Sequence, residues 1–203
     1  MYVALIGESV KGKRTITFDS GLELSFYKKE IASFHLEEGM ELSDEVFHEL
    51  YYEIIGKRVK KRALFLLEKM DRTESQLREK LVANQYPNEL IEAAVSYVKE
   101  YHYIDDLRFA QNYIQYRQNI KSAMRLKLEL LQKGVSKTVI GQALEDTYKT
   151  DEVQIIKQFL VKKHYYEVES DPNQKRKIYQ ALLRKGFKND DIIHAMKCED
   201  YLT

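Results

Sequence analysis

The feature that most constrains this chain of 203 residues is an internal repeat. Three segments superpose without gaps at offsets of 49 and 52 residues: LREKLVANQYPNELIEAAV (77–95), LKLELLQKGVSKTVIGQAL (126–144) and IYQALLRKGFKNDDIIHAM (178–196). Apolar residues coincide at five positions of this alignment. They are Leu77, Leu126 and Ile178; Leu81, Leu130 and Leu182; Tyr86, Val135 and Phe187; Ile91, Ile140 and Ile192; and Ala94, Ala143 and Ala195.

Each segment predicts a helix, a tight turn and a second helix, because its apolar residues recur at three- and four-residue spacing. A further amphipathic helix is expected before each one, at about 57–70, 105–119 and 151–166. The predicted fold class is therefore mainly α. Tandem three-helix repeats over 57–103, 104–150 and 151–203 form an elongated, curved array, which offers an extended surface in place of one deep pocket.

The N-terminal segment, residues 1–56, has a different pattern. Alternating apolar and polar residues in TITFDSGLELSFY predict a β-hairpin around Asp19-Ser20-Gly21. Further strands are expected over 2–6 and 31–36. A helix should begin after Ser43, whose hydroxyl suits a helix N-cap.

Charge changes at the same place as the pattern. Residues 1–56 carry five Lys and Arg against eleven Asp and Glu, whereas residues 57–203 carry 28 against 21. Such asymmetry indicates different partners or packing roles, and it predicts a domain boundary near Gly56.

Helix ends within the repeats carry recognisable caps. Thr73 and Gln76 match a capping box, and Asp105 is a typical N-cap residue. Gly134 and Gly186 each follow a basic last turn, as expected of glycines that end a helix.

The chain offers little for catalysis or for a metal. Gly7, Gly12 and Lys13 fit the phosphate-binding pattern G-x-x-x-x-G-K, but Arg14 replaces its Ser or Thr and a strand follows in place of a helix, so we expect a β-turn and no NTPase. The five histidines lie far apart, without zinc-site spacing. Adjacent Asp105 and Asp106 are better explained as caps than as an acid pair.

Compartment and membrane follow from composition. The single cysteine, Cys198, allows no internal disulfide and has no base near it in sequence, so a nucleophile is not expected. There is no run of apolar residues long enough for a membrane span, and no export signal is recognised. A cytoplasmic location is expected.

Basic residues form two candidate binding faces. Each face has two explanations: an ordinary solvated helix face, or a surface that binds phosphates or an acidic protein groove. The primary face lies in the second repeat: Arg108, Arg117, Lys121, Arg125, Lys127 and Lys133. The secondary face consists of Lys57, Arg58, Lys60, Lys61, Arg62, Lys175, Arg176 and Lys177. Arg108 has a structural alternative, pairing with a carboxylate near its helix start, while Phe109, Ala110, Leu126 and Leu130 are assigned to the core.

Residues 57–145 resemble the RecX family of bacterial RecA regulators. The resemblance rests on Arg62-Ala63-Leu64 with Leu67, the stretch 74–81, Ile104-Asp105-Asp106-x-Arg108-Phe109-Ala110, Arg117, Arg125-Leu126, Glu129-Leu130 and Lys133-Gly134-Val135. It is weaker over 151–203. The acidic N-terminal segment is similar to the extension of longer Gram-positive members, which usually run further at the C-terminus, so a truncated chain or a shorter homologue are both open.

The resemblance implies a non-enzymatic regulator that needs no cofactor. Such proteins lie in the groove of the RecA–single-stranded DNA filament and suppress its ATPase, strand-exchange and coprotease activities, which places this chain in recombination, DNA repair and the SOS response. The implied partner is the RecA filament, with single-stranded DNA as a second candidate, no membrane and a monomeric state. Two other functions stay open: a general nucleic-acid-binding helical module, and a protein-interaction scaffold.

Overall fold

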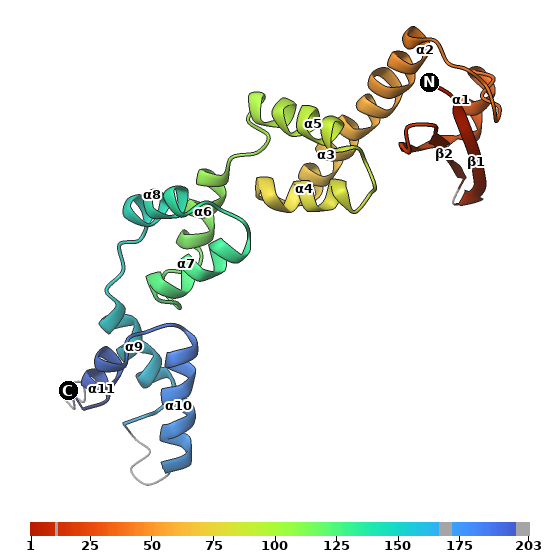
Figure 1. Ribbon diagram of the computed structural model, residues 1–203. Helices are drawn as coiled ribbons and strands as arrows, with labels where there is room; N and C mark the ends of the chain where they lie inside the picture. Colours follow the sequence, from red (N-terminus) through yellow and green to blue (C-terminus); the bar gives the residue numbers. More distant parts are fainter. Residues whose placement is uncertain (11, 167–171, 198–203) are drawn as a thin grey trace. The chain divides into compact units, whose positions relative to one another are not determined.

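The structure is a computed structural model, and it describes residues 1–10, 12–166 and 172–197. The fold is mainly helical, with a small sheet near the N-terminus (Figure 1). Two compact units are distinguished: the first consists of residues 1–70 and 77–103, and the second of residues 71–76 and those from 104 onward. Each unit is described by itself.

The first unit begins with a three-stranded antiparallel sheet in the order β1-β2-β3. The strands are β1 (Val3–Val10), β2 (Lys13–Phe18) and β3 (Glu23–Tyr27). Ile16 pairs with Leu24 across β2 and β3, and both are buried together with Phe18 and Phe26. The alternation of apolar and polar residues thus places one face of the hairpin in the core, which confirms the predicted hairpin.

The strand predicted over 31–36 is wrong. The chain forms a short helix there, α1 (Lys28–Ser33). The side chain of Glu30 explains its start, because Glu30 Oε2 accepts a hydrogen bond from the backbone N–H of Tyr27 at 2.7 Å. The alternating apolar residues of this stretch do not share one buried face, since Ala32 is exposed, Phe34 is half-buried and Leu36 is buried.

A continuous helical run joins the N-terminal segment to the first repeat. It consists of α2 (Asp44–His48), a wide π-helical segment η1 (Glu49–Gly56) and α3 (Lys57–Lys69). Ser43 caps its start, as predicted, by accepting a hydrogen bond from the N–H of Val46 at 3.3 Å. Gly56 has φ −58° and ψ −45°, so the change of composition falls inside a helix and within one compact unit.

Three groups of three helices follow the repeat in the sequence (Figure 1). They are α3, α4 (Glu74–Val82) and α5 (Asn88–Glu100); α6 (Asp106–Gln115), α7 (Ala123–Gln132) and α8 (Lys137–Thr147); and α9 (Glu152–Lys162), α10 (Pro172–Arg184) and α11 (Asn189–Lys197). The aligned apolar residues are all buried except Tyr86, which is half-buried. The repeat in the sequence is therefore a repeat of the core. The limits of the repeats at 57, 104 and 151 stay a prediction.

Core assignments in the second repeat are confirmed for Ala110, Leu126 and Leu130, which are all inaccessible to solvent. The assignment of Phe109 to the core holds only in part, because its side chain packs against this core but is only partly buried.

Candidate functional site

Two helix starts in the second unit are buried, and each holds the end of another helix. Thr73 and Ser122 are both fully buried polar residues. The Thr73 hydroxyl donates a hydrogen bond to the carbonyl of Lys133 at 2.6 Å, and the Ser122 N–H donates one to the carbonyl of Lys185 at 3.2 Å. Each contact pairs the cap of a second helix with the C-terminal end of the second helix in the next repeat.

Neighbouring contacts repeat as well. The N–H of Glu74, the first residue of α4, donates to Asp106 Oδ1 at 2.9 Å. The N–H of Ala123, the first residue of α7, donates to Glu152 Oε1 at 2.8 Å. We call each set of contacts a joint: the 73–134 joint and the 122–186 joint. Because buried backbone groups need partners, the joints fix where α4 and α7 begin. Helix α7 carries Arg125 and Lys127 of the primary face.

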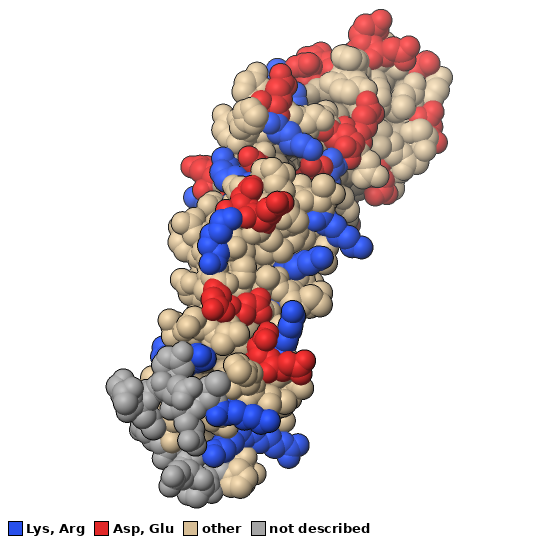
Figure 2. Space-filling view, turned by 90° about the vertical axis from the view of Figure 1, so that its left-hand side faces the viewer, with Lys and Arg blue, Asp and Glu red and all other residues tan. Residues whose placement is uncertain are grey.

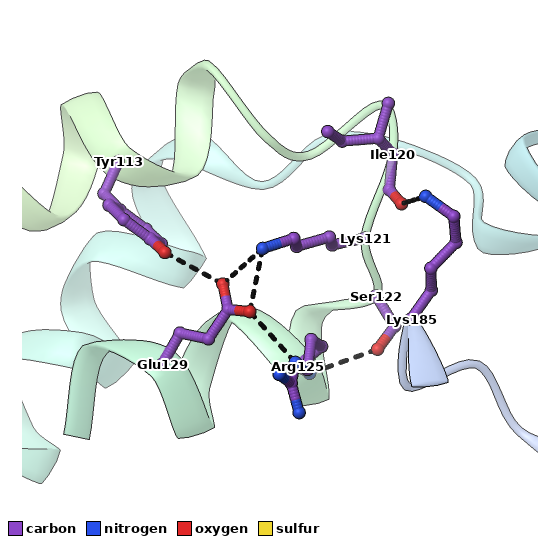
Figure 3. Close-up of polar contacts among 7 residues, drawn as sticks. All are labelled: Tyr113, Ile120, Lys121, Ser122, Arg125, Glu129 and Lys185. Carbon is purple, nitrogen blue, oxygen red and sulfur yellow. Dashed lines mark hydrogen bonds and ion pairs between the residues drawn. The ribbon is translucent and has the colours of Figure 1, made fainter. Parts of the chain in front are cut away.

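Glu129 is the centre of the basic cluster in the second repeat (Figure 3). Lys121 Nζ lies 2.8 and 2.7 Å from its two carboxylate oxygens, and Arg125 Nε donates to Oε1 at 2.9 Å. The Tyr113 hydroxyl donates to Oε2 at 2.9 Å. With a side chain only 12% exposed, Glu129 holds three donors from α6, the 116–122 connection and α7 in one place.

Tyr113 also collects cations on its ring. The Arg117 guanidinium lies 4.0 Å from the ring centroid, and Lys133 Nζ lies 5.3 Å from it. Cations over an aromatic face are attracted by its negative charge density. Four predicted basic residues, Arg117, Lys121, Arg125 and Lys133, are therefore gathered around one carboxylate and one ring. The cluster keeps a net positive charge.

The pKa values of the cluster reflect burial and hydrogen bonding. Burial alone raises the pKa of Glu129, but the hydrogen bonds from Lys121, Tyr113 and Arg125 outweigh it and leave this pKa below its ordinary value. Burial, then the hydrogen bond to Glu129, raises the pKa of Tyr113. The carboxylate is thus ionised at neutral pH, and the phenol is protonated.

Lys185 extends this region across the 122–186 joint (Figure 3). Its Nζ donates to the carbonyl of Ile120 at 3.0 Å, beside Lys121. Burial, and secondarily the charge of Lys121, lowers the pKa of Lys185.

Two residues predicted for the primary face stand apart from the cluster. Arg108, in the first turn of α6, and Lys127, on α7, are exposed. Within the described ranges neither side chain has a hydrogen bond, an ion pair or a ring contact with another residue. The structural alternative for Arg108, pairing with a carboxylate, therefore gains no support from a contact. Both cations face solvent.

The secondary face is not one surface. Arg58 is largely buried, and its guanidinium bonds the Ser25 carbonyl at 2.6 Å and the Glu30 carboxylate at 2.5 Å, so it ties α3 to the sheet and α1. Lys57 pairs with Glu53 at 2.9 Å. The other members on α3, Lys60, Lys61 and Arg62, lie in the first unit, whereas Lys175, Arg176 and Lys177 lie on α10 in the second.

The residues that the sequence analysis considered and set aside for catalysis or metal binding are placed as follows. Gly7 lies in β1, and β2 follows Gly12, so no helix opens at the phosphate-loop pattern. Asp105 caps α6 by accepting the Arg108 N–H at 3.0 Å, while Asp106 accepts from Glu74. The five histidines are exposed. Cys198 lies outside the described residues.

Neither a metal site nor a membrane span is found in the described ranges. Among these residues no three His, Cys, Asp or Glu side chains come together as ligands would. Their helices are also too short or too polar to cross a bilayer. Figure 2 shows acidic side chains over the N-terminal segment in its upper part, and Lys and Arg interspersed with acids over the rest of the face.

Sequence reasoning missed the two residues that organise the cluster. Glu129 follows Arg125 by four residues on α7, and Tyr113 precedes Arg117 by four, which are spacings at which helical side chains meet. These i, i+4 spacings could have shown from the sequence that Glu129 contacts Arg125 and that Tyr113 contacts Arg117. That Lys121, from the connection between α6 and α7, would reach the same carboxylate depends on tertiary structure.

The fold and its joints define a class: proteins built of tandem three-helix repeats behind a small β-containing segment. Family models agree with this division of the chain. The first, second and third three-helix domains of RecX match residues 60–97, 105–144 and 150–196. The chain belongs to the RecX family.

Curated relatives support the same assignment. "Regulatory protein RecX" of Caldanaerobacter subterraneus subsp. tengcongensis is 32% identical over 163 residues, covering 79% of this chain and 80% of the relative. The protein of the same name from Clostridioides difficile is 28% identical over 181 residues, covering 87% and 84%. The family is one of regulatory proteins.

Solved structures share the fold. A crystal structure of RecX from Lactobacillus salivarius is 26% identical, with a TM-score of 0.59 over 70% of this chain and 94% of that one. Another, of a regulatory protein RecX, has a TM-score of 0.60 and covers 96% of this chain and 98% of that one, at 22% identity. This second likeness concerns the fold alone.

Proposed function

We propose that this protein binds the RecA–single-stranded DNA filament and inhibits its ATPase, strand-exchange and coprotease activities. The observation that carries the proposal is the match of all three RecX domains, in order, over residues 60–196. The protein acts by binding, without a cofactor and without catalysing a reaction, as a cytoplasmic monomer.

The primary face supplies the contact in this proposal. Arg108 and Lys127 are exposed cations whose side chains no other described residue engages. The cluster around Glu129 fixes two further cations of this face, Lys121 and Arg125, by short hydrogen bonds. Exposed cations attract a polyanion such as the DNA of a nucleoprotein filament over distances set by salt.

The test is the single-stranded-DNA-dependent ATPase of the cognate RecA, with this protein titrated in below stoichiometric amounts. Strong inhibition at such ratios is expected, because a regulator that acts at filament ends or interfaces needs few copies. Inhibition only when the protein saturates free DNA would replace the proposal with simple competition for DNA. No effect at any ratio would overturn it.

Two further readouts separate the alternatives. Equal affinity for bare single-stranded DNA with and without RecA, and no effect on the ATPase of the filament, would favour a general nucleic-acid-binding module. Isothermal titration calorimetry with ATP and magnesium tests the G-x-x-x-x-G-K segment. Binding of nucleotide there would contradict the proposal that the protein is not an enzyme.

A further inference from the structure

A row of three tyrosines, one half-buried and two exposed, closes the first repeat. The ring centroids of Tyr97 and Tyr101 lie 4.8 Å apart, and those of Tyr101 and Tyr103 lie 6.4 Å apart. Tyr101 is 57% exposed and Tyr103 is 50% exposed. Large apolar rings in such a row are unusual on a surface that no partner covers.

The backbone holds this row in place. His102, between the last two tyrosines, has φ +54°, which turns the chain sharply after α5. The N–H of Tyr103 then donates to the carbonyl of Val98 at 2.8 Å. The rings therefore sit on a fixed helix end and turn, which reduces the conformational entropy lost when a ligand binds.

The outer face of α3 continues the surface. Helices α3 and α5 lie side by side in the first unit (Figure 1). Lys61, Leu64, Phe65 and Glu68 follow each other at helical spacing, and together with Leu67 and Tyr103 they line a hollow of about 540 Å³. Phe65 is 46% exposed in this hollow. Phe65 is thus a further exposed ring, and it lines the same hollow as Tyr103.

Cations lie over two of the rings, Tyr97 and Phe65. Lys60 Nζ lies 5.3 Å from the centroid of Tyr97. The Arg62 guanidinium and Lys69 Nζ lie 5.4 and 5.5 Å from the centroid of Phe65. Lys61 and Glu68 balance each other in the lining of the hollow, and Lys60, Arg62 and Lys69 beside the rings give the surface its excess of positive charge. We call Lys60, Lys61, Phe65, Tyr97, Tyr101 and Tyr103 the aromatic–basic platform.

From this combination we infer that the platform binds single-stranded DNA, with bases on the rings and phosphates on the lysines. Exposed rings beside a basic surface are the features by which proteins bind single strands without reading sequence. A duplex keeps its bases stacked inside and offers the rings nothing, and an apolar protein partner would not use the cations beside Tyr97 and Phe65. The inference deepens the proposed function, in which single-stranded DNA lies beside this chain.

The first test measures binding of the full-length protein to fluorescein-labelled oligothymidylate, without RecA, by fluorescence anisotropy. Replacing Tyr101 and Tyr103 together by Leu should weaken binding about tenfold or more, because each stacked base contributes substantially to affinity. The Tyr101→Phe, Tyr103→Phe pair should bind as the parent does. Tyr116→Leu is the matched control, since Tyr116 is 81% exposed in the other unit and belongs to no ring pair among the described residues.

The second test separates charge from stacking. In the Lys60→Ala, Lys61→Ala variant the slope of log affinity against log salt should fall by about 1.4, as for the loss of two phosphate contacts on a single strand. The Leu variants should keep the parent slope. For duplex DNA of the same length, the Leu variants should bind as tightly as the parent.

Three results would overturn the inference: no binding of oligothymidylate by the parent protein, parental affinity in the Tyr→Leu pair, or an equal loss in Tyr116→Leu. The RecA ATPase, assayed separately, keeps the two proposals distinct. A protein that inhibits RecA but does not bind oligothymidylate refutes the platform alone. One that binds oligothymidylate but leaves RecA unaffected refutes the proposed function alone.

Discussion

Gly134 offers the sharpest test of the repeated joints. Its φ is +83°, a conformation that favours glycine, and an added Cβ would lie 2.2 Å from Ser75 Cβ and 2.3 Å from Ser75 Oγ. The backbone conformation alone costs about 1–2 kcal/mol for a residue with a side chain. Overpacking at the joint adds about 1–3 kcal/mol. We therefore expect Gly134→Ala to lower the free energy of unfolding of the second unit by about 2–5 kcal/mol.

Controls separate the two costs. Gly39 has φ +81° with nothing within 4 Å of an added Cβ, so Gly39→Ala should show the conformational cost alone. Gly141 lies in α8 of the same unit as Gly134, also with open space around it. Gly141→Ala should stabilise that unit by about 1 kcal/mol, the usual gain in a helix interior.

Urea denaturation followed by far-ultraviolet circular dichroism gives the stabilities, and hydrogen exchange at residues 71–76 shows whether the 73–134 joint itself has opened. In the double variant Gly134→Ala, Ser75→Gly the atoms in collision are gone, so the loss relative to Ser75→Gly should shrink to the conformational cost. A loss in Gly134→Ala no larger than that in Gly39→Ala, or no relief in the double variant, would refute the reasoning.

Two further predictions concern the second repeat. Glu129→Gln should destabilise it by about 2 kcal/mol through weaker hydrogen bonds to Lys121 and Arg125. Folding lowers the pKa of Glu129, so the ionised carboxylate stabilises the fold fully above its ordinary pKa of 4.5, and this contribution is lost as the pH falls. The unfolding free energies of parent and variant should therefore converge in urea titrations at acid pH. A difference between them that does not depend on pH would contradict this. Arg108→Ala with Lys127→Ala should weaken inhibition of the RecA ATPase several-fold while the melting temperature stays unchanged; exposed Lys137→Ala is the control, and full inhibition by the double variant would move the contact elsewhere.

The structure changes how the primary face can be tested. Replacing Arg117, Arg125 and Lys127 together by Ala would test this face only if thermal stability stayed nearly unchanged. Arg125 bonds Glu129, however, and Arg117 covers the ring of Tyr113. Their removal would alter the cluster as well as the surface, so a loss of inhibition in that triple variant would not identify a contact.

Local and periodic features were predictable from the sequence. The buried positions of the repeat follow from spacing, and the caps at Ser43, Thr73 and Asp105 follow from residue chemistry next to a helix start. The hairpin follows from alternation around Gly21. Each of these depends on neighbours within a few residues.

Features that depend on distant residues were not predictable. The helix over 28–33 is supported by Glu30, which also holds Arg58 from α3. The domain boundary near Gly56 stays a prediction; that the change of composition there falls in helical backbone close to Leu90 was not visible in the sequence. Charge counting placed Arg125 and Lys121 on a free surface, whereas a single carboxylate holds both.

The joints give the array a direction. A buried Thr or Ser at the start of one repeat's second helix receives the end of the second helix of the repeat that follows. The position that matches Thr73 and Ser122 in the third repeat is Gln174, which lies inside α10 and carries no hydroxyl. The third repeat therefore supplies the helix end that the second repeat binds, but it has no buried hydroxyl with which to bind the helix end of a following repeat. A fusion that added another copy of the second repeat after α11 would need Gln174 remade as a cap before the new copy could lock on.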